Sequence, residues 1–309
     1  MELDFAKLHG AGNDFIVIDD FSREIELTAQ QIAWLCDRRF GIGADGIILV
    51  RPSDTPECAA YMHYINADGS LAEMCGNGVR CFAKYLVDRR FVETKDRFLA
   101  ADTKAGVRSI TYSVDEAGAL VSATVDMGTP ALAPETVPTT LRANAESPWG
   151  EPCVLDAVVE SPWGPFAFTC VSMGNPHAVC FLDDMNSLPD GLFADFTDKT
   201  LATFDLDRIG AYFEHHPAFP EKTNVEFAVA SEKGIAMRVY ERGCSETLAC
   251  GTGACATGVA ACLSGRAPRT NEVLLPGGVL AIDWKDDGRV FMTGPSEESF
   301  SGTVRIPDL

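Results

Sequence analysis

The pattern of hydrophobic and polar positions predicts alternating strands and helices in the first half of the chain. Three short runs predict strands: a β-rich run at 15–19, an apolar run at 46–50 and a third candidate at 61–65. Between the first two runs, residues 28–40 carry apolar side chains at helical spacing, behind a threonine that can cap a helix. This order of strand, helix and strand is typical of an α/β protein.

Two further segments predict helices that are buried. Residues 75–90 have one apolar face, and residues 247–265 run without a charge but contain mainly small side chains. The second segment is too weakly hydrophobic for a membrane span, so it predicts a buried helix of small residues. Prolines concentrated between 130 and 165 predict a domain junction with a loop region. The apolar face of the 75–90 helix consists of Val79, Phe82, Ala83 and Leu86.

The second half of the chain repeats the first. A Gly-Asn pair precedes a strand in both halves, and the helix that includes Ile32 has a counterpart around Ile209. A cysteine followed by Gly-x-Gly occurs at 75–78 and again at 250–253, each behind a serine at the same spacing. Each half then closes on a turn of methionine and glycine, at 127–128 and at 292–294. These four correspondences in the same order favour two similar α/β lobes. We expect one lobe at 1–128, completed by residues 296–309, and the other at 129–295.

Composition narrows the classes of partner. The 309 residues include 45 acidic and 25 basic side chains, for a net charge of −20, which argues against a nucleic-acid partner. No membrane partner is expected either. Eleven cysteines without a C-x-x-C pair, behind a start that lacks the layout of a secretory signal, predict a cytoplasmic protein with neither a disulfide scaffold nor structural zinc.

The repeated cysteine motif predicts a particular chemistry. The N–H groups at the start of a helix bind carboxylates and lower the pKa of a nearby thiol. If the two lobes present Cys75 and Cys250 to opposite sides of one molecule, one thiolate can remove a proton while the other thiol returns one. That pair of steps inverts a stereocentre next to a carboxylate, and it needs no cofactor. Most of the other nine cysteines are expected to be small core residues.

Six ordered motifs across both halves resemble the diaminopimelate epimerase family. They are HGAGNDFIVID (9–19), GIGADG (41–46), NADGSLAEMCGNGVR (66–80), SMGNPHAV (172–179), FPEKTNVEF (219–227) and ERGCSETLACGTGACA (241–256). The resemblance implies an α/β (α+β) fold of two pseudo-symmetric domains, each a curled, barrel-like sheet around a central helix. It implies interconversion of LL- and meso-2,6-diaminopimelate for lysine and peptidoglycan biosynthesis, with no cofactor, in a possible homodimer.

The resemblance also implies roles for individual residues. Cys75 and Cys250 take the acid and base roles. The side chains expected to hold the amino and carboxylate groups of the substrate are Asn13, Asn66, Asn175, Asn224 and Arg242. The residues expected to offer backbone N–H groups to the reacting carboxylate are Gly76, Asn77, Gly251 and Thr252. His177 and Glu241 are expected as polar partners near the thiols and the α-amino group.

One departure and three alternatives bear on this interpretation. Gly46 stands where many relatives carry glutamine, so a contact to the distal end of the substrate is expected to be missing or replaced. GIGADG also fits a dinucleotide fingerprint, but it follows a helix and opens a strand, which is the reverse of the required order. A related racemase of another amino acid, such as proline or histidine, remains open. A catalytically inactive relative is disfavoured because both thiols are retained.

Overall fold

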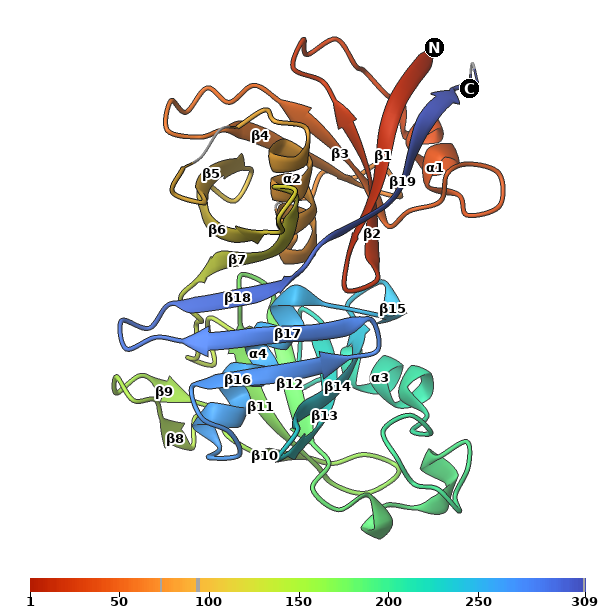
Figure 1. Ribbon diagram of the computed structural model, residues 1–309. Coiled ribbons are helices and arrows are strands. Elements are labelled where there is room, and N and C mark those ends of the chain that lie inside the picture. The colour runs from red at the N-terminus through yellow and green to blue at the C-terminus, as the bar shows by residue number, and fades with distance from the viewer. Residues whose placement is uncertain (73, 93–94, 308) are drawn as a thin grey trace. The chain divides into compact units, whose positions relative to one another are not determined.

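The computed structural model describes residues 1–72, 74–92, 95–307 and 309. The chain forms two compact units (Figure 1). Unit 1 comprises Met1–Asp126 together with Thr293–Leu309, and unit 2 comprises Met127–Met292. The C-terminal segment therefore returns to the unit that contains the N-terminus, where it forms a strand beside the first strand of the chain.

Unit 1 is one curved sheet with two helices. Its strands are β1 (Glu2–Gly10), β2 (Asn13–Asp19), β3 (Gly46–Arg51), β4 (Ala60–Asn66), β5 (Phe98–Thr103), β6 (Arg108–Val114), most of β7 (Leu120–Gly128) and β19 (Glu297–Arg305). Its helices are α1 (Ala29–Cys36) and α2 (Gly76–Asp88). The three strands predicted at 15–19, 46–50 and 61–65 are confirmed as parts of β2, β3 and β4.

Unit 2 has the same kinds of element. Its main strands are β10 (Ala157–Val159), β11 (Phe166–Ser172), β12 (Pro176–Phe181), β13 (Asn224–Ser231), β14 (Gly234–Glu241), β15 (Ser245–Thr247), β16 (Thr270–Leu275), β17 (Gly278–Trp284) and the first part of β18 (Val290–Pro295). A two-residue hairpin is formed by β8 (Ala145–Glu146) and β9 (Pro152–Cys153). Its helices are α3 (Leu206–Glu214), α4 (Gly251–Leu263) and two 3₁₀ turns, η1 (Met185–Ser187) and η2 (Asp190–Leu192).

The two units share one order of strand pairing. In unit 1, β1 to β6 pair with their successors as antiparallel, parallel, antiparallel, parallel and antiparallel. The same series runs through β11, β12, β13, β14, β16 and β17 in unit 2. A helix lies in each parallel connection, as such a crossover requires. The mixed α/β fold with an internal repeat is therefore confirmed in the topology of the chain.

The second helix of each unit is central. Helix α2 contacts β1 to β5, and α4 contacts β11 to β14, β16 and β17. The apolar face predicted for α2 is fully buried, and burial extends around the helix from Gly76 to Leu86 because strands surround it. Helix α4 is buried by small residues that let the sheet approach closely. Among the described residues, no helix is both long enough and apolar enough to cross a membrane.

The helix boundaries differ from the predictions in three places. The helix predicted at 28–40 ends at Cys36, because the Asp37 carboxylate accepts the backbone N–H groups of Arg39 and Phe40 and turns the chain. The capping threonine is confirmed, since Thr28 accepts the N–H of Gln31 in a capping box. The helix predicted at 75–90 ends at Asp88, and the one predicted from 247 begins only at Gly251, after strand β15.

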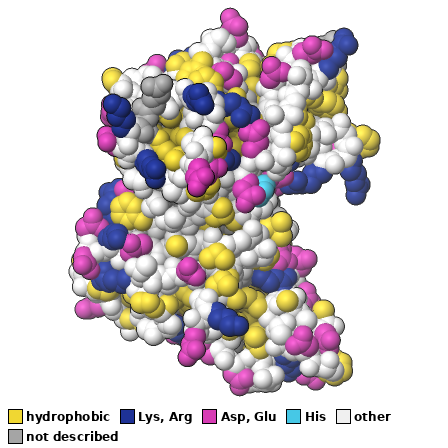
Figure 2. Space-filling view, in the orientation of Figure 1, with side chains coloured by type: hydrophobic (Ala, Val, Ile, Leu, Met, Phe, Trp, Pro, Cys, Tyr) yellow, Lys and Arg dark blue, Asp and Glu magenta, His cyan; other side chains and the backbone are white. Residues whose placement is uncertain are grey.

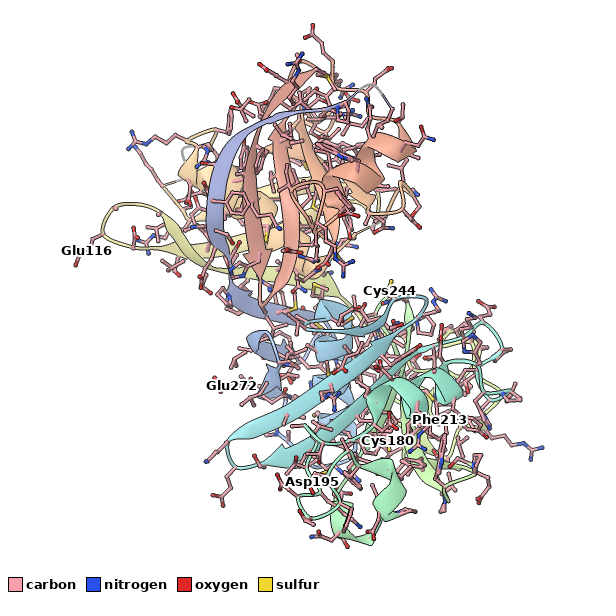
Figure 3. The ribbon with its side chains drawn as sticks, turned by 90° about the vertical axis from the view of Figure 1, so that its right-hand side faces the viewer. Glu116, Cys180, Asp195, Phe213, Cys244 and Glu272 are labelled. Carbon is pink, nitrogen blue, oxygen red and sulfur yellow. The ribbon has the colours of Figure 1, made fainter. Side chains whose placement is uncertain are left out.

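The core of unit 2 is built from phenylalanines. Phe213 of α3 is labelled in Figure 3. Around it pack Phe166, Phe168 and Phe227, and the ring centroids of Phe168 and Phe213 lie 4.8 Å apart. The proline-rich segment, predicted as a junction and loop region, also contributes buried side chains to this core. It therefore belongs to the body of unit 2. These side chains are Val137, Val154 and Val159.

Candidate active site

Cys75 is the N-cap residue of α2 in unit 1. Its backbone is extended (φ −138°, ψ 120°), and its Sγ accepts the N–H of Gly78 at 3.4 Å. The thiol in turn donates to Asn13 Oδ1 at 3.4 Å. Asn77 Nδ2 donates to the same oxygen at 3.2 Å. Three of the residues that the sequence singled out are thus brought together at the start of one buried helix.

The Asn13 amide has a fixed orientation. Its Nδ2 donates to Asp45 Oδ2 at 2.6 Å, and Arg38 Nη2 donates to the other Asp45 oxygen at 2.8 Å. Arg38 also binds both oxygens of Asp14, which pairs with Lys7 at 2.8 Å. Burial opposes ionisation of Asp14, but the two cations outweigh it and lower the pKa of this carboxyl to about 2. With its NH₂ group held by Asp45, Asn13 turns its carbonyl oxygen toward the thiol.

Arg80 joins the start of α2 to the C-terminal segment of the chain. It is fully buried, and Nη2 donates to Asn77 Oδ1 at 2.8 Å while Nη1 donates to the Gly76 carbonyl at 3.3 Å. Its Nε donates to the Pro295 carbonyl at 3.2 Å. The guanidinium therefore fixes the Asn77 side chain, whose NH₂ group is the one that reaches Asn13.

Cys250 is the N-cap residue of α4 and the counterpart of Cys75 in unit 2. Its Sγ accepts the N–H of Gly253 at 3.4 Å and lies 3.5 Å from Thr252 Oγ1. Gly253 must lack a side chain, because a Cβ there would lie 2.8 Å from Glu226 Oε1 and 3.3 Å from Cys250 Sγ. The buried Glu226 carboxyl therefore lies at the first turn of α4, close to the thiol.

A hydrogen-bonded row of three side chains in unit 2 comes from β12, from β13 and from the residue just before β12. His177 Nδ1 is 2.6 Å from Glu226 Oε1, and His177 Nε2 is 3.0 Å from Asn175 Oδ1. Both His177 and Glu226 are completely buried. Asn175 follows Gly174, which has a positive φ of 95°, as Asn13 follows Gly12 at 84°. The Gly-Asn repeat read from the sequence is thus a repeated turn that glycine permits.

Two other predicted residues of unit 2 are also joined. Asn224 Nδ2 donates to the Pro176 carbonyl at 2.7 Å, and Asn224 Oδ1 accepts the N–H of Arg242 at 3.0 Å. The exposed Arg242 guanidinium donates to the Glu221 carbonyl at 3.3 Å. Glu241 accepts a short hydrogen bond from the Thr247 hydroxyl. Asn224 therefore orients the backbone of Arg242 rather than leaving its amide open to a ligand.

The prediction that a helix start lowers the pKa of a nearby thiol is wrong for Cys250. Burial raises the pKa of this thiol well above its usual value of 9.0, and the carboxyl groups of Glu241 and Glu226 raise it further. The hydrogen bonds from Thr252 and Gly253 act in the opposite direction but do not outweigh these effects. Cys250 is consequently a protonated thiol at neutral pH.

This protonation state predicts slow alkylation of Cys250. Since its pKa is raised, the reactive thiolate forms only well above pH 9.0. We expect iodoacetamide to label the exposed Cys244 first at pH 8, and Cys250 to react only as the pH rises past that range. Peptide mapping by mass spectrometry across a pH series measures both rates. Rapid labelling of Cys250 at pH 7 would contradict the expectation.

Asn66 and Gly46 lie opposite each other in the β3–β4 register. Asn66 Nδ2 donates to Ser70 Oγ at 3.0 Å, so its side chain closes the turn after β4. A Cβ at Gly46 would lie 2.6 Å from both the Ile65 carbonyl oxygen and the Tyr64 ring. The departure at position 46 thus has a local cause, because the Tyr64 ring occupies the space of a side chain there.

Comparison with protein-family models and with known proteins shows to which family the chain belongs. The model described as diaminopimelate epimerase matches residues 5–133 and 169–298. A diaminopimelate epimerase of Synechocystis is 47% identical over 309 residues, covering 99% of this chain and 100% of the relative. One from Synechococcus elongatus is 44% identical over 308 residues, with 99% of both chains covered.

The chain belongs to the diaminopimelate epimerase family. Solved structures with the same fold include a hydroxyproline epimerase from Agrobacterium vitis, at 15% identity and a TM-score of 0.65, covering 98% of this chain and 91% of that one. A phenazine biosynthesis protein of the PhzF family from Bacillus anthracis, also at 15% identity, has a TM-score of 0.66 and covers 99% of this chain and 100% of its own.

Three residues that orient site residues of this family member were not predicted from its sequence. Asp45 orients Asn13, Arg80 orients Asn77, and Glu226 binds His177. All three lie inside motifs that resemble the family, and each is a charged residue within or beside an apolar run. That position was the available signal, because a charge on a buried strand or helix needs a partner.

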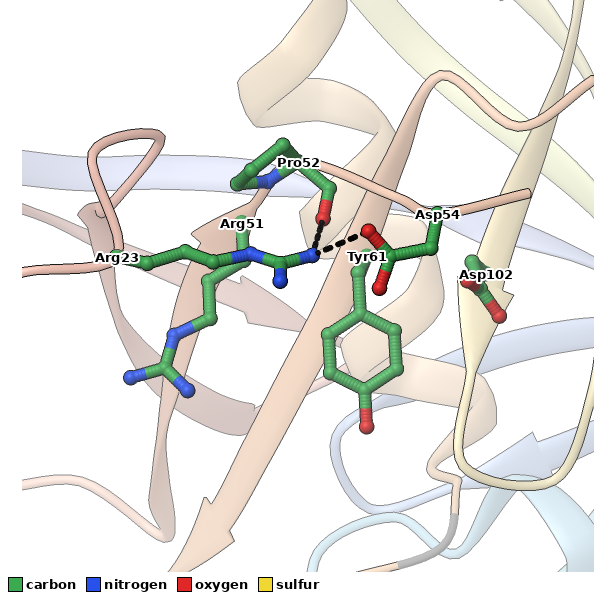
Figure 4. Close-up of a pocket in the computed structure, with 6 residues that line it drawn as sticks. All are labelled: Arg23, Arg51, Pro52, Asp54, Tyr61 and Asp102. Carbon is green, nitrogen blue, oxygen red and sulfur yellow. Dashed lines mark hydrogen bonds and ion pairs between the residues drawn. The ribbon is translucent and has the colours of Figure 1, made fainter. Parts of the chain in front are cut away.

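The cavity drawn in Figure 4 lies apart from these residues. It has a volume of about 260 Å³. The charged side chains of its lining already bind each other or neighbours, as Arg23 does with Asp54 at 3.0 Å. In the described part of the chain, no three histidine, cysteine or acidic side chains are grouped as metal ligands would be. Acidic side chains are spread over the surface drawn in Figure 2 rather than gathered in one patch. The cavity lining consists of Arg23, Arg51, Pro52, Asp54, Tyr61 and Asp102.

Proposed function

We propose that this protein interconverts LL- and meso-2,6-diaminopimelate by proton transfer through Cys75 and Cys250, without a cofactor. The observation that carries the proposal is the repeated cysteine cap, one at the central helix of each unit. It stands in a chain whose family resemblance covers nearly its whole length.

The proposed reaction is balanced in protons. One cysteine, as thiolate, takes the α-proton, while the other, as thiol, donates its proton to the opposite face of the same carbon. The electron pair of the broken C–H bond spreads onto the adjacent carboxylate during the step and returns to carbon as the new C–H bond forms. Each turnover exchanges the protonation states of the two cysteines, so the enzyme is ready for the reverse direction.

The starts of α2 and α4 suit stabilisation of that carboxylate. The first N–H groups of a helix lack partners within the helix, and the helix dipole adds positive potential there. We assign these donors to the backbone of Gly76 and Asn77 in α2 and of Gly251 and Thr252 in α4. Donors fixed before the reaction stabilise developing charge without reorganisation.

Side-chain roles follow from the hydrogen bonds already formed. Asn13 accepts from Cys75 through its carbonyl oxygen, a contact that holds the proton whenever Cys75 is the thiol of the pair. The exposed guanidinium of Arg242 is assigned to a substrate carboxylate, which it can bind with two parallel hydrogen bonds. Asn66 and Asn175 are assigned to the remaining polar groups of the substrate, and Glu241 to an ammonium group. His177 and Asn224 support their neighbours from buried positions.

Exchange of the α-proton with solvent tests the proposal. We expect purified protein in D₂O to convert LL-diaminopimelate to the meso form and to place deuterium at the inverted carbon, as read by ¹H NMR. Proline and histidine serve as matched controls, because the alternative racemases would exchange their α-protons instead. Exchange of either control faster than diaminopimelate, or no exchange of diaminopimelate, would contradict the proposed function.

A further inference from the structure

Glu226 is a buried carboxyl group that the proposed proton transfers do not use. It is fully buried on β13, and its Oε1 lies 2.6 Å from His177 Nδ1. Its second oxygen, Oε2, is buried without a hydrogen-bond partner among the described residues. Burying a carboxyl group with one oxygen unsatisfied costs stability, so such a group calls for a functional explanation.

The strand register brings Glu226 and His177 to one face of the sheet. Strands β12 and β13 are parallel, with His177 opposite Asn224 and Val179 opposite Glu226. Side chains two residues apart on a strand point to the same face, so the His177 ring is the diagonal neighbour of the Glu226 carboxyl. Asn175 lies just before β12, on the other side of the ring.

The contacts of His177 define where its protons are. Its Nε2 is 3.0 Å from Asn175 Oδ1, which can only accept, so Nε2 carries a proton and donates it. Its Nδ1 is 2.6 Å from a carboxyl oxygen, and a proton lies between these two atoms whether the pair is imidazole with carboxylic acid or imidazolium with carboxylate. Both forms keep the Nε2 proton directed at Asn175. Burial raises the pKa of Glu226, which favours retention of the shared proton.

We propose that Glu226 is a positioning residue that acts through His177 on Asn175. Glu226 sets the protonation of the imidazole, and the imidazole holds the Asn175 carbonyl oxygen, so that the Asn175 NH₂ group faces the ligand as a hydrogen-bond donor. This inference rests on the proposed function, in which the ligand is an amino acid, and it names the group recognised there as a carboxylate.

The counterpart in unit 1 is oriented in the opposite sense. Asp45 holds the NH₂ group of Asn13, so Asn13 presents an acceptor, whereas His177 holds the carbonyl of Asn175, so Asn175 presents a donor. The two asparagines of the sequence repeat therefore have different tasks. Asn13 turns its carbonyl oxygen to the Cys75 thiol and to Asn77, whereas Asn175 keeps its NH₂ group for a ligand.

Three other titratable groups face Glu226 from the elements around it. They are His177 on β12, Glu241 at the end of β14 and Cys250 at the start of α4. Glu226 Oε1 and Cys250 Sγ both lie within 3.3 Å of the position that a Cβ would take at Gly253. A variant at 226 is therefore judged by substrate affinity and by the protons on His177, since changes in rate alone could come from Cys250.

Two variants at position 226 separate positioning from packing. Glu226→Leu has similar volume but cannot bind Nδ1, so we expect KM for LL-diaminopimelate to rise about tenfold or more, with a smaller change in kcat. Glu226→Gln can donate its amide N–H to Nδ1 and keep the Nε2 proton in place, so it should rescue KM to within about threefold of the wild-type value. Equal KM values in Glu226→Leu and the wild type would overturn the proposal, as would failure of the rescue in a folded protein.

A spectroscopic measurement tests the same chain of contacts without relying on turnover. In protein with ¹⁵N-labelled histidine, we expect the His177 Nε2 signal to show a bound proton in the wild type and in Glu226→Gln, and a mixture of tautomers in Glu226→Leu. A wild-type tautomer with an unprotonated Nε2 would overturn the proposal. If the wild type failed to exchange the α-proton of diaminopimelate, the proposed function would fall while this measurement still decided the role of Glu226.

Asn175→Asp provides a second variant that leaves the core unchanged. An aspartate accepts the same hydrogen bond from His177 but replaces the outward NH₂ group by an oxygen that repels a carboxylate, so KM should rise about tenfold or more while the His177 tautomer is retained. An unchanged KM would overturn the donor role. Asp20→Asn, at a buried carboxyl of unit 1 that binds Arg51, is the matched control and should leave KM unaltered.

Discussion

Replacement of either capping cysteine by alanine should lower the rate of diaminopimelate epimerisation by about a thousandfold or more, because each thiol supplies one of the two proton transfers. Each Sγ also accepts one backbone N–H, from Gly78 or from Gly253. Loss of such a cap costs about 1 kcal/mol, so the folded state of Cys75→Ala and Cys250→Ala should survive. Epimerisation of diaminopimelate in D₂O measures the loss of rate, and urea denaturation measures the change in stability.

The two helices offer matched controls for this experiment. Cys81 and Cys255 lie on α2 and α4, close in sequence to the capping cysteines, and both are fully buried. Their replacement by alanine removes a thiol of the same helix without removing a cap, and the rate should stay within about threefold of the wild-type value. A capping-cysteine variant that turns over as fast as these controls would refute the proposed two-thiol mechanism.

Arg80 is expected to have the largest effect on stability. Arg80→Leu would leave the Asn77 side chain and the carbonyls of Gly76 and Pro295 without the donor that now reaches them. Buried acceptors that lose their partners cost about 1–3 kcal/mol each, so we expect the free energy of unfolding of unit 1 to fall by about 3–5 kcal/mol. Urea denaturation followed by circular dichroism measures this change.

Arg89, at the other end of the same helix, is the control for Arg80. It is partly exposed and pairs with Glu298 at 3.0 Å. Because exposed ion pairs contribute little, Arg89→Leu should change the free energy of unfolding by less than about 1 kcal/mol. If the two variants lost similar stability, the buried contacts of Arg80 would not be the reason for its effect.

Local sequence patterns predicted the elements well and their ends less well. Runs of β-branched, aromatic and other apolar residues marked β2, β3 and β4, because β-branched and aromatic residues suit a pleated, buried surface. The end of α1 was missed because it depends on one side chain, Asp37, which binds two backbone N–H groups. The start of α4 was missed because the residues before it pair with β14, and apolar spacing cannot register that pairing.

The sequence predicted which side chains lie near the cysteines but not how those side chains are oriented. Asn13, Asn77 and Cys75 do form one group in unit 1, and Asn175 and His177 another in unit 2. The carbonyl of Asn13 is turned to the thiol by Asp45, which is 32 residues away in the chain. Such contacts join separate strands, so they follow from the fold and have no local pattern.

By itself, the sequence determined the repeat, the family and the two cysteines that begin the central helices, because these depend on residue type and spacing. Only the tertiary structure decided the protonation of Cys250 and the opposite orientations of Asn13 and Asn175. A helix start considered alone favours a thiolate, but burial beside Glu241 and Glu226 favours the neutral thiol. Burial and the charges of neighbouring strands are properties of packing, and at this site they outweigh the hydrogen bonds that Thr252 and Gly253 give the thiol.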